Sequence, residues 1–361
     1  MYMIKNILLF FLFLSISVGS FASETTDSLS ATPTAAKEKF RADKMIIDHI
    51  VDAYEWHITT IGEHHISIPL PVILYSKTSG FHCFMSSKFH HGEKMVNNFK
   101  IAKEKPYEGK IVEIVNGKEV RPYDLSITKN VVALLFSMVL ILWIFLSVAK
   151  RYKTKPNTAP KGLQSFIEPV VLFVRDDIAK SSIGEERYEK FTPYLLSIFF
   201  FIWINNMLGL IPFFPGGANI TGNITITMLL AVFTFIITTF SGNKHYWQEI
   251  FNNPVVPWWL KIPIPLMPVV EFIGIFTKPF VLMVRLFANM SAGHIVALGF
   301  YSLIFIFGHM SIGAGYGISI VSLIFTIFMA LLELLVAFIQ AYVFTLLSAL
   351  YFGMARPEES H

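Results

Sequence analysis

Two apolar stretches near the C-terminus are longer than a membrane crossing needs, and they constrain the fold more than any other feature. They cover residues 269–301 and 318–354, with a glycine-rich segment, 308–317, between them. A helix crosses the hydrocarbon core with about 20 residues, so both helices should be tilted or should extend beyond it. The glycine-rich segment is predicted to be a turn, which makes the two helices antiparallel. We therefore expect a polytopic membrane protein.

The rest of the chain fits the same class. Hydrophobic residues make up 54% of it and charged residues only 15%, where a soluble domain carries about a quarter charged residues. Three further apolar segments predict spans at 130–149, 191–211 and 223–240, and an amphipathic segment at 162–178 predicts an interfacial helix. The predicted fold is all-α, with five transmembrane helices, an interfacial helix and a small N-terminal domain.

The distribution of Lys and Arg predicts the orientation. Nine of them crowd into the loop 150–190, whereas 212–222 and 308–317 have none. Because cytoplasmic loops carry the excess of positive charge, the N-terminal region is expected outside and the C-terminus, with Arg356, inside. The proline-rich stretch around Trp258 and Trp259 is expected to lie irregularly at the cytoplasmic interface.

The N-terminus is divided into two regions. Residues 1–22 resemble a signal peptide, with an apolar core followed by small residues, and an uncleaved anchor helix is the alternative; a signal peptide places 23–125 in the periplasm. Alternating segments at 65–70 and 110–115, and an Asn116-Gly117 turn, predict some β-structure there. Seven of the eleven histidines fall in this region, but their spacings match no tight metal motif, so we expect no metal site. The membrane domain is predicted to cover 126–361.

Several polar residues interrupt the last two apolar segments. A charge in the hydrocarbon costs about 2.5–3.5 kcal/mol on insertion scales, so such residues are candidate functional sites. Structural alternatives exist for most of them: an interfacial pair for Glu271 and Lys278, an interhelical hydrogen bond for Asn289, and a structural pair for His294 and Glu333. The full set is Glu271, Lys278, Arg285, Asn289, His294, Glu333 and Gln340.

Arg285 is the hardest of these to explain structurally, because residues 283–290 hold no carboxylate. His294 follows it by nine residues, about 13–14 Å along a helix and half a turn around it. If Gln340 is level with Arg285 in the antiparallel pair, then Glu333 is level with His294. A histidine and a carboxylate can pass protons near neutral pH, whereas a guanidinium cannot. A proton path that stops beside a fixed charge is therefore predicted.

The residues around Arg285 resemble the signature helix of a known family. The string Arg285-Leu-Phe-Ala-Asn289-Met-Ser-Ala-Gly-His294 is similar to that of subunit a of F-type ATP synthases. Further similar strings begin at Asn206, at Thr221 (which includes Asn223), at Thr277 and at Glu333, so the resemblance covers about 125–356. It implies two proton half-channels to the carboxylates of a c-subunit ring, with Arg285 as the barrier between them. Many bacterial members have the His294 and Glu333 residue types exchanged, and the periplasmic domain departs from their short N-terminus.

The resemblance also implies binding partners and a membrane location for the chain. Expected partners are the c-subunit ring, b-type peripheral stalk subunits, the F1 sector through the complex, and the lipid bilayer of a bacterial inner membrane. We expect no nucleic acid, no cofactor and no catalytic activity of the subunit on its own. Asn289, His294, Glu333 and Gln340 are predicted to act with Arg285, and Asn206, Asn223, Glu271 and Lys278 to act secondarily.

Two other functions are weighed against this one. A proton-coupled secondary transporter is the main alternative, but such folds usually show internal repeats, and none is found. An intramembrane hydrolase would need a motif such as His-Glu-x-x-His, which the sequence lacks. The coupling ion stays open, because the histidine–glutamate pair favours protons whereas sodium is selected mainly by the ring subunit.

Overall fold

The structure is a computed structural model that describes residues 46–47, 51–61, 64–90, 92, 94–104, 106–154, 159–211, 216–252, 266–310 and 312–355. Three predicted features lie outside these residues and stay predictions. They are the signal peptide at 1–22, the interfacial stretch around Trp258 and Trp259, and the cytoplasmic end at Arg356.

Five helices of the described chain are long and apolar enough to cross a membrane. They are α3 (Lys129–Thr154), α6 (Tyr188–Leu210), α7 (Ile224–Ser241), α9 (Leu266–Met310) and α10 (Ile312–Ala355). The number and the order of the predicted spans are thus confirmed. The side of the membrane on which each loop lies stays a prediction from charge.

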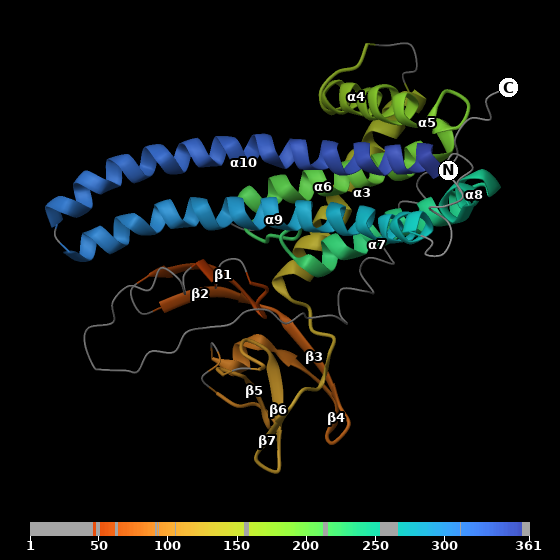
Figure 1. The fold of residues 1–361 in the computed structure, drawn as a ribbon. Coiled ribbons are helices and arrows are strands. Elements are labelled where there is room, and N and C mark those ends of the chain that lie inside the picture. Colours follow the sequence, from red (N-terminus) through yellow and green to blue (C-terminus); the bar gives the residue numbers. More distant parts are fainter. Residues whose placement is uncertain are drawn as a thin grey trace.

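Helices α9 and α10 form an antiparallel hairpin that runs the length of the molecule (Figure 1). They have 45 and 44 residues. At about 1.5 Å per residue each is roughly 65 Å long, twice the thickness of the hydrocarbon core. Figure 1 shows α3 crossing behind them at a steep angle, so all three cannot be perpendicular to one membrane. This geometry agrees with the predicted tilt of the two long helices.

The chain reverses direction within the predicted turn at 308–317, but the turn is much shorter than predicted because the helices include nearly all of this segment. Helix α9 continues to Met310 and α10 begins at Ile312. A Cβ atom added at Gly315 would lie 2.9 Å from the Cα atom of Gly308. The glycines therefore do not break the helices. They let the two helix ends approach each other closely, which shortens the connection.

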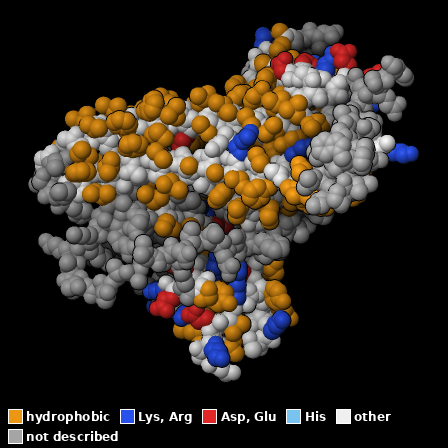
Figure 2. Space-filling view, viewed as in Figure 1, with side chains coloured by type: hydrophobic (Ala, Val, Ile, Leu, Met, Phe, Trp, Pro, Cys, Tyr) orange, Lys and Arg blue, Asp and Glu red, His pale blue; other side chains and the backbone are white. Residues whose placement is uncertain are grey.

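Shorter helices lie at the end of the molecule away from the strands (Figure 1). Helix α4 (Leu163–Phe173) matches the predicted interfacial helix, and it is followed by a π-helix, Val174–Lys180, and by α5 (Ser181–Ile183). Helix α8 (Lys244–Asn252) was not predicted. Figure 2 shows hydrophobic side chains covering the α9–α10 hairpin, with most of the visible charged side chains near α4 and α5 at the top right and on the strand region below the hairpin.

The N-terminal region contains short antiparallel strands. They are β1 (Glu55–Ile61), β2 (His64–Pro69), β3 (Pro71–Ser76), β4 (Gly80–Met85), β5 (Phe99–Ile101), β6 (Ile111–Val115), β7 (Lys118–Val120) and β8 (Tyr123–Asp124), with a 3-10 turn at Ser86–Phe89. The strand orders are β1-β2, β4-β3-β8 and β5-β6-β7. Strands β2 and β6 fall where alternation predicted them. Asn116 and Gly117 both have positive φ, 52° and 75°, as a two-residue hairpin turn requires.

A buried carboxylate joins two of these sheets. Glu113 of β6 is 3% exposed and accepts hydrogen bonds from the hydroxyls of Ser76, Thr78 (2.9 Å) and Ser79 (2.7 Å), at the end of β3 and in the turn that follows it. Burial alone would raise the pKa of Glu113, but these hydrogen bonds outweigh it and the pKa lies below its usual value. The ionised carboxylate therefore holds β3 and β6 together.

The strand region, residues 51–125, is attached firmly to the start of α3. The backbone N–H of Lys129 donates to the Ala53 carbonyl (2.9 Å), and the N–H of Asn130 donates to Asp52 Oδ1 (3.0 Å). Trp56 of β1 is buried in the same apolar cluster as Ala133 of α3. Because Asp52 satisfies an N–H of the first helical turn, the strand region and the membrane helix are fixed relative to each other.

Candidate functional site

The antiparallel packing of α9 against α10 determines which polar residues of the two helices lie opposite each other. Phe300 stacks on Phe325, with ring centroids 5.1 Å apart, and the Lys278 ammonium lies 5.7 Å from the Tyr351 ring centroid. Between these two contacts the register places Arg285 opposite about residue 343. Gln340 is then within about one helical turn of the level of Arg285.

His294 and Glu333 meet in the interior between these contacts. Their Nδ1 and Oε1 atoms are 3.6 Å apart, and the two side chains are only 14% and 11% exposed. This separation is within ion-pair range but is longer than a hydrogen bond. A proton can therefore pass between the two groups only after a small movement or through a water molecule.

Two glycines make room for this pair. A Cβ atom at Gly293 would lie 2.9 Å from Glu333 Oε1, and one at Gly209 of α6 would lie 3.7 Å from His294 Nε2. Neither glycine was among the predicted site residues. Their signal is local: Gly293 directly precedes His294, and Gly209 lies in the string that begins at Asn206.

Asn206 of α6 lies one helical turn along α10 from the pair. It is fully buried, and its Nδ2 donates to the carbonyl of Ala337 (3.1 Å). Its Oδ1 accepts from the hydroxyl of Thr221 (2.5 Å), a residue that sequence reasoning did not propose as a site. Nearby, the Ser291 hydroxyl donates to the Gly222 carbonyl (3.4 Å). Buried polar groups from α6, α9, α10 and the loop before α7 thus gather on one side of the hairpin.

Arg285 and Asn289 lie on the opposite side of α9 and are exposed. The exposed residues of this part of α9 recur at helical spacing, which makes them one face; they are Val281, Val284, Arg285, Ala288, Asn289, Ala292, Ile295 and Val296. Among the described residues, no carboxylate lies within 4.0 Å of the Arg285 guanidinium. The face is apolar apart from Arg285 and Asn289.

The remaining predicted residues are more dispersed. Gln340 is buried (6% exposed). Asn223 caps α7, because its side-chain oxygen accepts from the N–H of Thr225 (3.0 Å). Glu271 and Lys278 form no ion pair in the described chain, which argues against an interfacial pair. Instead Lys278 lies over Tyr351, and Glu271 faces Tyr246 of α8, where burial and then the charge of Glu271 raise the pKa of the tyrosine.

Comparison with known proteins bears on what these residues do. A family described as ATP synthase A chain matches residues 131–353, and a domain of unknown function (DUF8433) matches residues 45–125. Relatives named ATP synthase subunit a occur in Chloroherpeton thalassium (46% identical over 67% of this chain and 70% of the relative) and in Myxococcus xanthus (43%, over 64% and 73%). One from Prosthecochloris aestuarii, named ATP synthase subunit a 2, is 47% identical over 66% and 71%.

The first family match covers nearly all of the segment from α3 to α10, including all the predicted site residues. These similarities favour the ATP synthase over the secondary transporter and the intramembrane hydrolase. The chain therefore belongs to the family of subunit a of F-type ATP synthases, membrane-sector subunits that take part in ion transport and ATP synthesis.

Proposed function

We propose that the chain is the proton-conducting stator subunit of its ATP synthase, a non-catalytic subunit that provides two half-channels to the carboxylates of a c-subunit ring. The observation that carries this proposal is the division of polar residues around α9. The His294–Glu333 pair faces inward, whereas Arg285 faces out of the chain. A path inside the subunit and a charge presented to a partner are what such a stator needs.

The exposed face of α9 is proposed to contact the ring. Arg285 lies there beside Ala288 and Ala292, whose small side chains let another helix approach closely. A guanidinium without a counter-ion is costly in hydrocarbon, so a passing ring carboxylate would supply the missing charge. Because a guanidinium does not exchange its proton at ordinary pH, Arg285 would keep that carboxylate ionised and pass no proton itself.

The polar groups on the other side of the hairpin are proposed to form one half-channel. Asn206, Thr221 and Ser291 lie around the His294–Glu333 pair, displaced from Arg285 toward the connection between α9 and α10. By the charge rule this end faces the periplasm, so protons enter here and reach the ring. The second half-channel would open on the cytoplasmic side of Arg285, toward Lys278 and Glu271.

The same charge rule supports a proposal for the membrane in which the complex lies and for its orientation. We propose that it lies in a bacterial inner membrane, with the strand region in the periplasm after removal of residues 1–22. The c-subunit ring, b-type stalk subunits and, through the complex, the F1 sector are the proposed partners. Purification tests this assembly directly: a solubilised chain that carries no small hydrophobic ring subunit and no ATPase would contradict it.

Replacing Arg285 tests the proposed barrier. Arg285→Ala should abolish ATP-driven proton pumping in inverted membrane vesicles, because the ring carboxylate loses its fixed counter-charge at the interface. The amount of assembled complex should stay near that of the wild type. A matched control is Arg175→Ala, since Arg175 pairs with Asp176 at 2.7 Å on the exposed π-helix, and this variant should pump normally. Retained pumping in Arg285→Ala would refute the barrier.

A further inference from the structure

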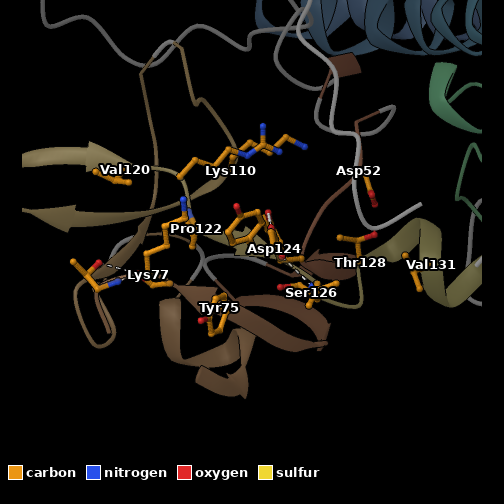
Figure 3. A pocket seen from close by; sticks show the side chains of 16 residues that line it. Asp52, Tyr75, Lys77, Lys110, Val120, Pro122, Asp124, Ser126, Thr128 and Val131 are labelled. Carbon is orange, nitrogen blue, oxygen red and sulfur yellow. Dashed lines mark hydrogen bonds between the residues drawn. The ribbon is translucent and has the colours of Figure 1, made fainter. Parts of the chain in front are cut away.

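A cavity of about 820 Å³ lies where the strand region meets α3, outside the site described above (Figure 3). Its walls come from the β3–β4 turn, the residues before β6, the segment from β7 to β8 and the first turn of α3. This volume is in the range of ligand-binding pockets. Because Thr128 and Val131 line it, the cavity opens where the membrane helix begins.

Three cations line this cavity: Lys77, Lys110 and Arg121. They come from three separate segments of the strand region. Among the residues that the structure describes, none of them has a carboxylate within 4.0 Å. Lys77 and Arg121 are exposed, and Lys110 is half-buried. Three like charges held around one space repel each other unless an anion lies between them.

The two carboxylates of the cavity are already engaged by the protein. Asp52 Oδ1 accepts from the N–H of Asn130 (3.0 Å), and burial raises the pKa of Asp52. Asp124 accepts from the Tyr54 hydroxyl and from the N–H of Ser126 (2.9 Å). Figure 3 shows Lys110 and Asp52 apart across the open space. The carboxylates therefore stabilise the walls without forming a described ion pair with the three cations, although the charge of Lys110 acts on Asp52 and Lys77 Nζ lies 6.0 Å from the Tyr123 ring centroid.

The rim of the cavity is apolar and exposed. Tyr75 and Tyr123 are 48% and 59% exposed, with ring centroids 6.3 Å apart, and Leu125 is 57% exposed. Exposed aromatic rings beside cations are typical of the interface between membrane and water, where the rings lie at headgroup level. A ligand with an anionic group and an apolar part would pair with the three cations and pack against the apolar rim.

We propose that this cavity binds a phosphate-bearing anion at the membrane surface, with Lys77, Lys110 and Arg121 around the phosphate and Tyr75, Tyr123 and Leu125 against its apolar part. The apolar rim favours the headgroup of an anionic phospholipid as the source of that phosphate over free phosphate. The bound headgroup would tie the strand region to the membrane beside α3. This inference is independent of the proposed half-channels.

Binding to the purified, delipidated complex in detergent tests the proposal. Calorimetric titration would use dihexanoyl phosphatidylglycerol, dihexanoyl phosphatidylcholine and inorganic phosphate as probes. We expect the wild type to bind phosphatidylglycerol more tightly than phosphatidylcholine, and more weakly as salt concentration rises. The triple variant Lys77→Ala, Lys110→Ala, Arg121→Ala should lose about 100-fold in affinity, since each of the three cations contributes about fivefold near a membrane surface.

A triple control has the same change of charge elsewhere on the strand region. Lys88→Ala, Lys103→Ala and Lys118→Ala alter exposed lysines that do not line the cavity, and this variant should bind as the wild type does. Should the first triple variant fail to assemble, Lys77→Gln with Arg121→Gln changes only exposed side chains and should still weaken binding. Equal affinity for inorganic phosphate would assign the site to free phosphate. If the wild type bound neither phosphatidylglycerol nor inorganic phosphate, the proposal would be overturned. An equal loss of affinity in both triple variants would also overturn it.

Discussion

Gly293 offers a sharp test of the His294–Glu333 pair, because a single methyl group would enter it. A Cβ atom at this position would lie 2.9 Å from Glu333 Oε1, 3.3 Å from Cγ and 3.5 Å from Cδ. The contact with Oε1 is too close to persist. In Gly293→Ala the carboxylate must therefore move by about 0.5 Å to reach an ordinary contact.

The expected effect separates function from stability. The His294–Glu333 separation is already 3.6 Å, so a further displacement takes the carboxylate out of reach of the ring nitrogen. A misplacement of about 1 Å can cost a reaction about 100-fold, so we expect a loss of about tenfold in proton translocation from the smaller shift. Alanine favours a helix over glycine by about 1 kcal/mol, so α9 itself should not be weakened.

The assay is ATP-driven proton pumping in inverted vesicles, with the rate divided by the amount of assembled complex. Gly299→Ala is the matched control on the same helix, because a Cβ atom there meets nothing within 4 Å in the described chain. It should pump at nearly the wild-type rate.

A second variant distinguishes the steric cause from other causes. Glu333→Asp shortens the side chain by one methylene and withdraws the carboxylate from residue 293. If the contact is responsible, Gly293→Ala should add little loss to Glu333→Asp, so the two changes should be strongly non-additive. Wild-type pumping in Gly293→Ala, or full additivity of the two losses, would refute the reasoning.

Two further predictions concern the same pair and the strand region. Exchanging the pair, with His294→Glu and Glu333→His together, should preserve more pumping than either single change, and equal loss in all three variants would mean that the residues do not act as a unit. Ser79→Ala should destabilise the strand region by about 1–3 kcal/mol at neutral pH, because it removes a hydrogen bond from buried Glu113. Since the pKa of Glu113 is lowered in the fold, its stabilisation is present above about pH 4.5 and is lost as the pH falls through the folded-state pKa. Hydrogen exchange of the β6 amides, corrected for the intrinsic rate at each pH, should therefore depend less on pH in Ser79→Ala, and an unchanged pH dependence would contradict this role.

Hydropathy alone predicted the membrane helices, because a span in hydrocarbon must satisfy its own backbone and carry apolar side chains. The sequence also predicted which residues of α9 lie level with Glu333 and Gln340, for a related reason. Two antiparallel helices with a short connection have their register set by that connection, and helical rise then converts residue spacing into depth.

Other features depend on contacts that spacing does not encode. Gly308 and Gly315 flank the predicted turn but lie inside the helices, where their lack of side chains allows the close approach of the two helix ends. Helix α8 is short and mostly polar, so a search for apolar segments passes over it, although Tyr246, Trp247 and Ile250 recur at helical spacing. The hydrogen bond from Thr221 to Asn206 joins a loop to α6. The spacing of these two residues in the sequence does not predict that they are in contact.

The described parts of α9 and α10 offer no continuous polar route past Arg285, and the proposed function accounts for this by passing the proton to a partner. On the side of Arg285 toward the N-terminus of α9, residues 279–284 are all apolar. The facing part of α10 contains Thr345 and Ser348, but both are fully buried and donate to carbonyls one turn earlier in their own helix. A proton that reaches the His294–Glu333 pair therefore cannot continue along these two helices. Under the proposed function it leaves the subunit on a ring carboxylate, and the outward-facing guanidinium makes that carboxylate give up its proton before it passes.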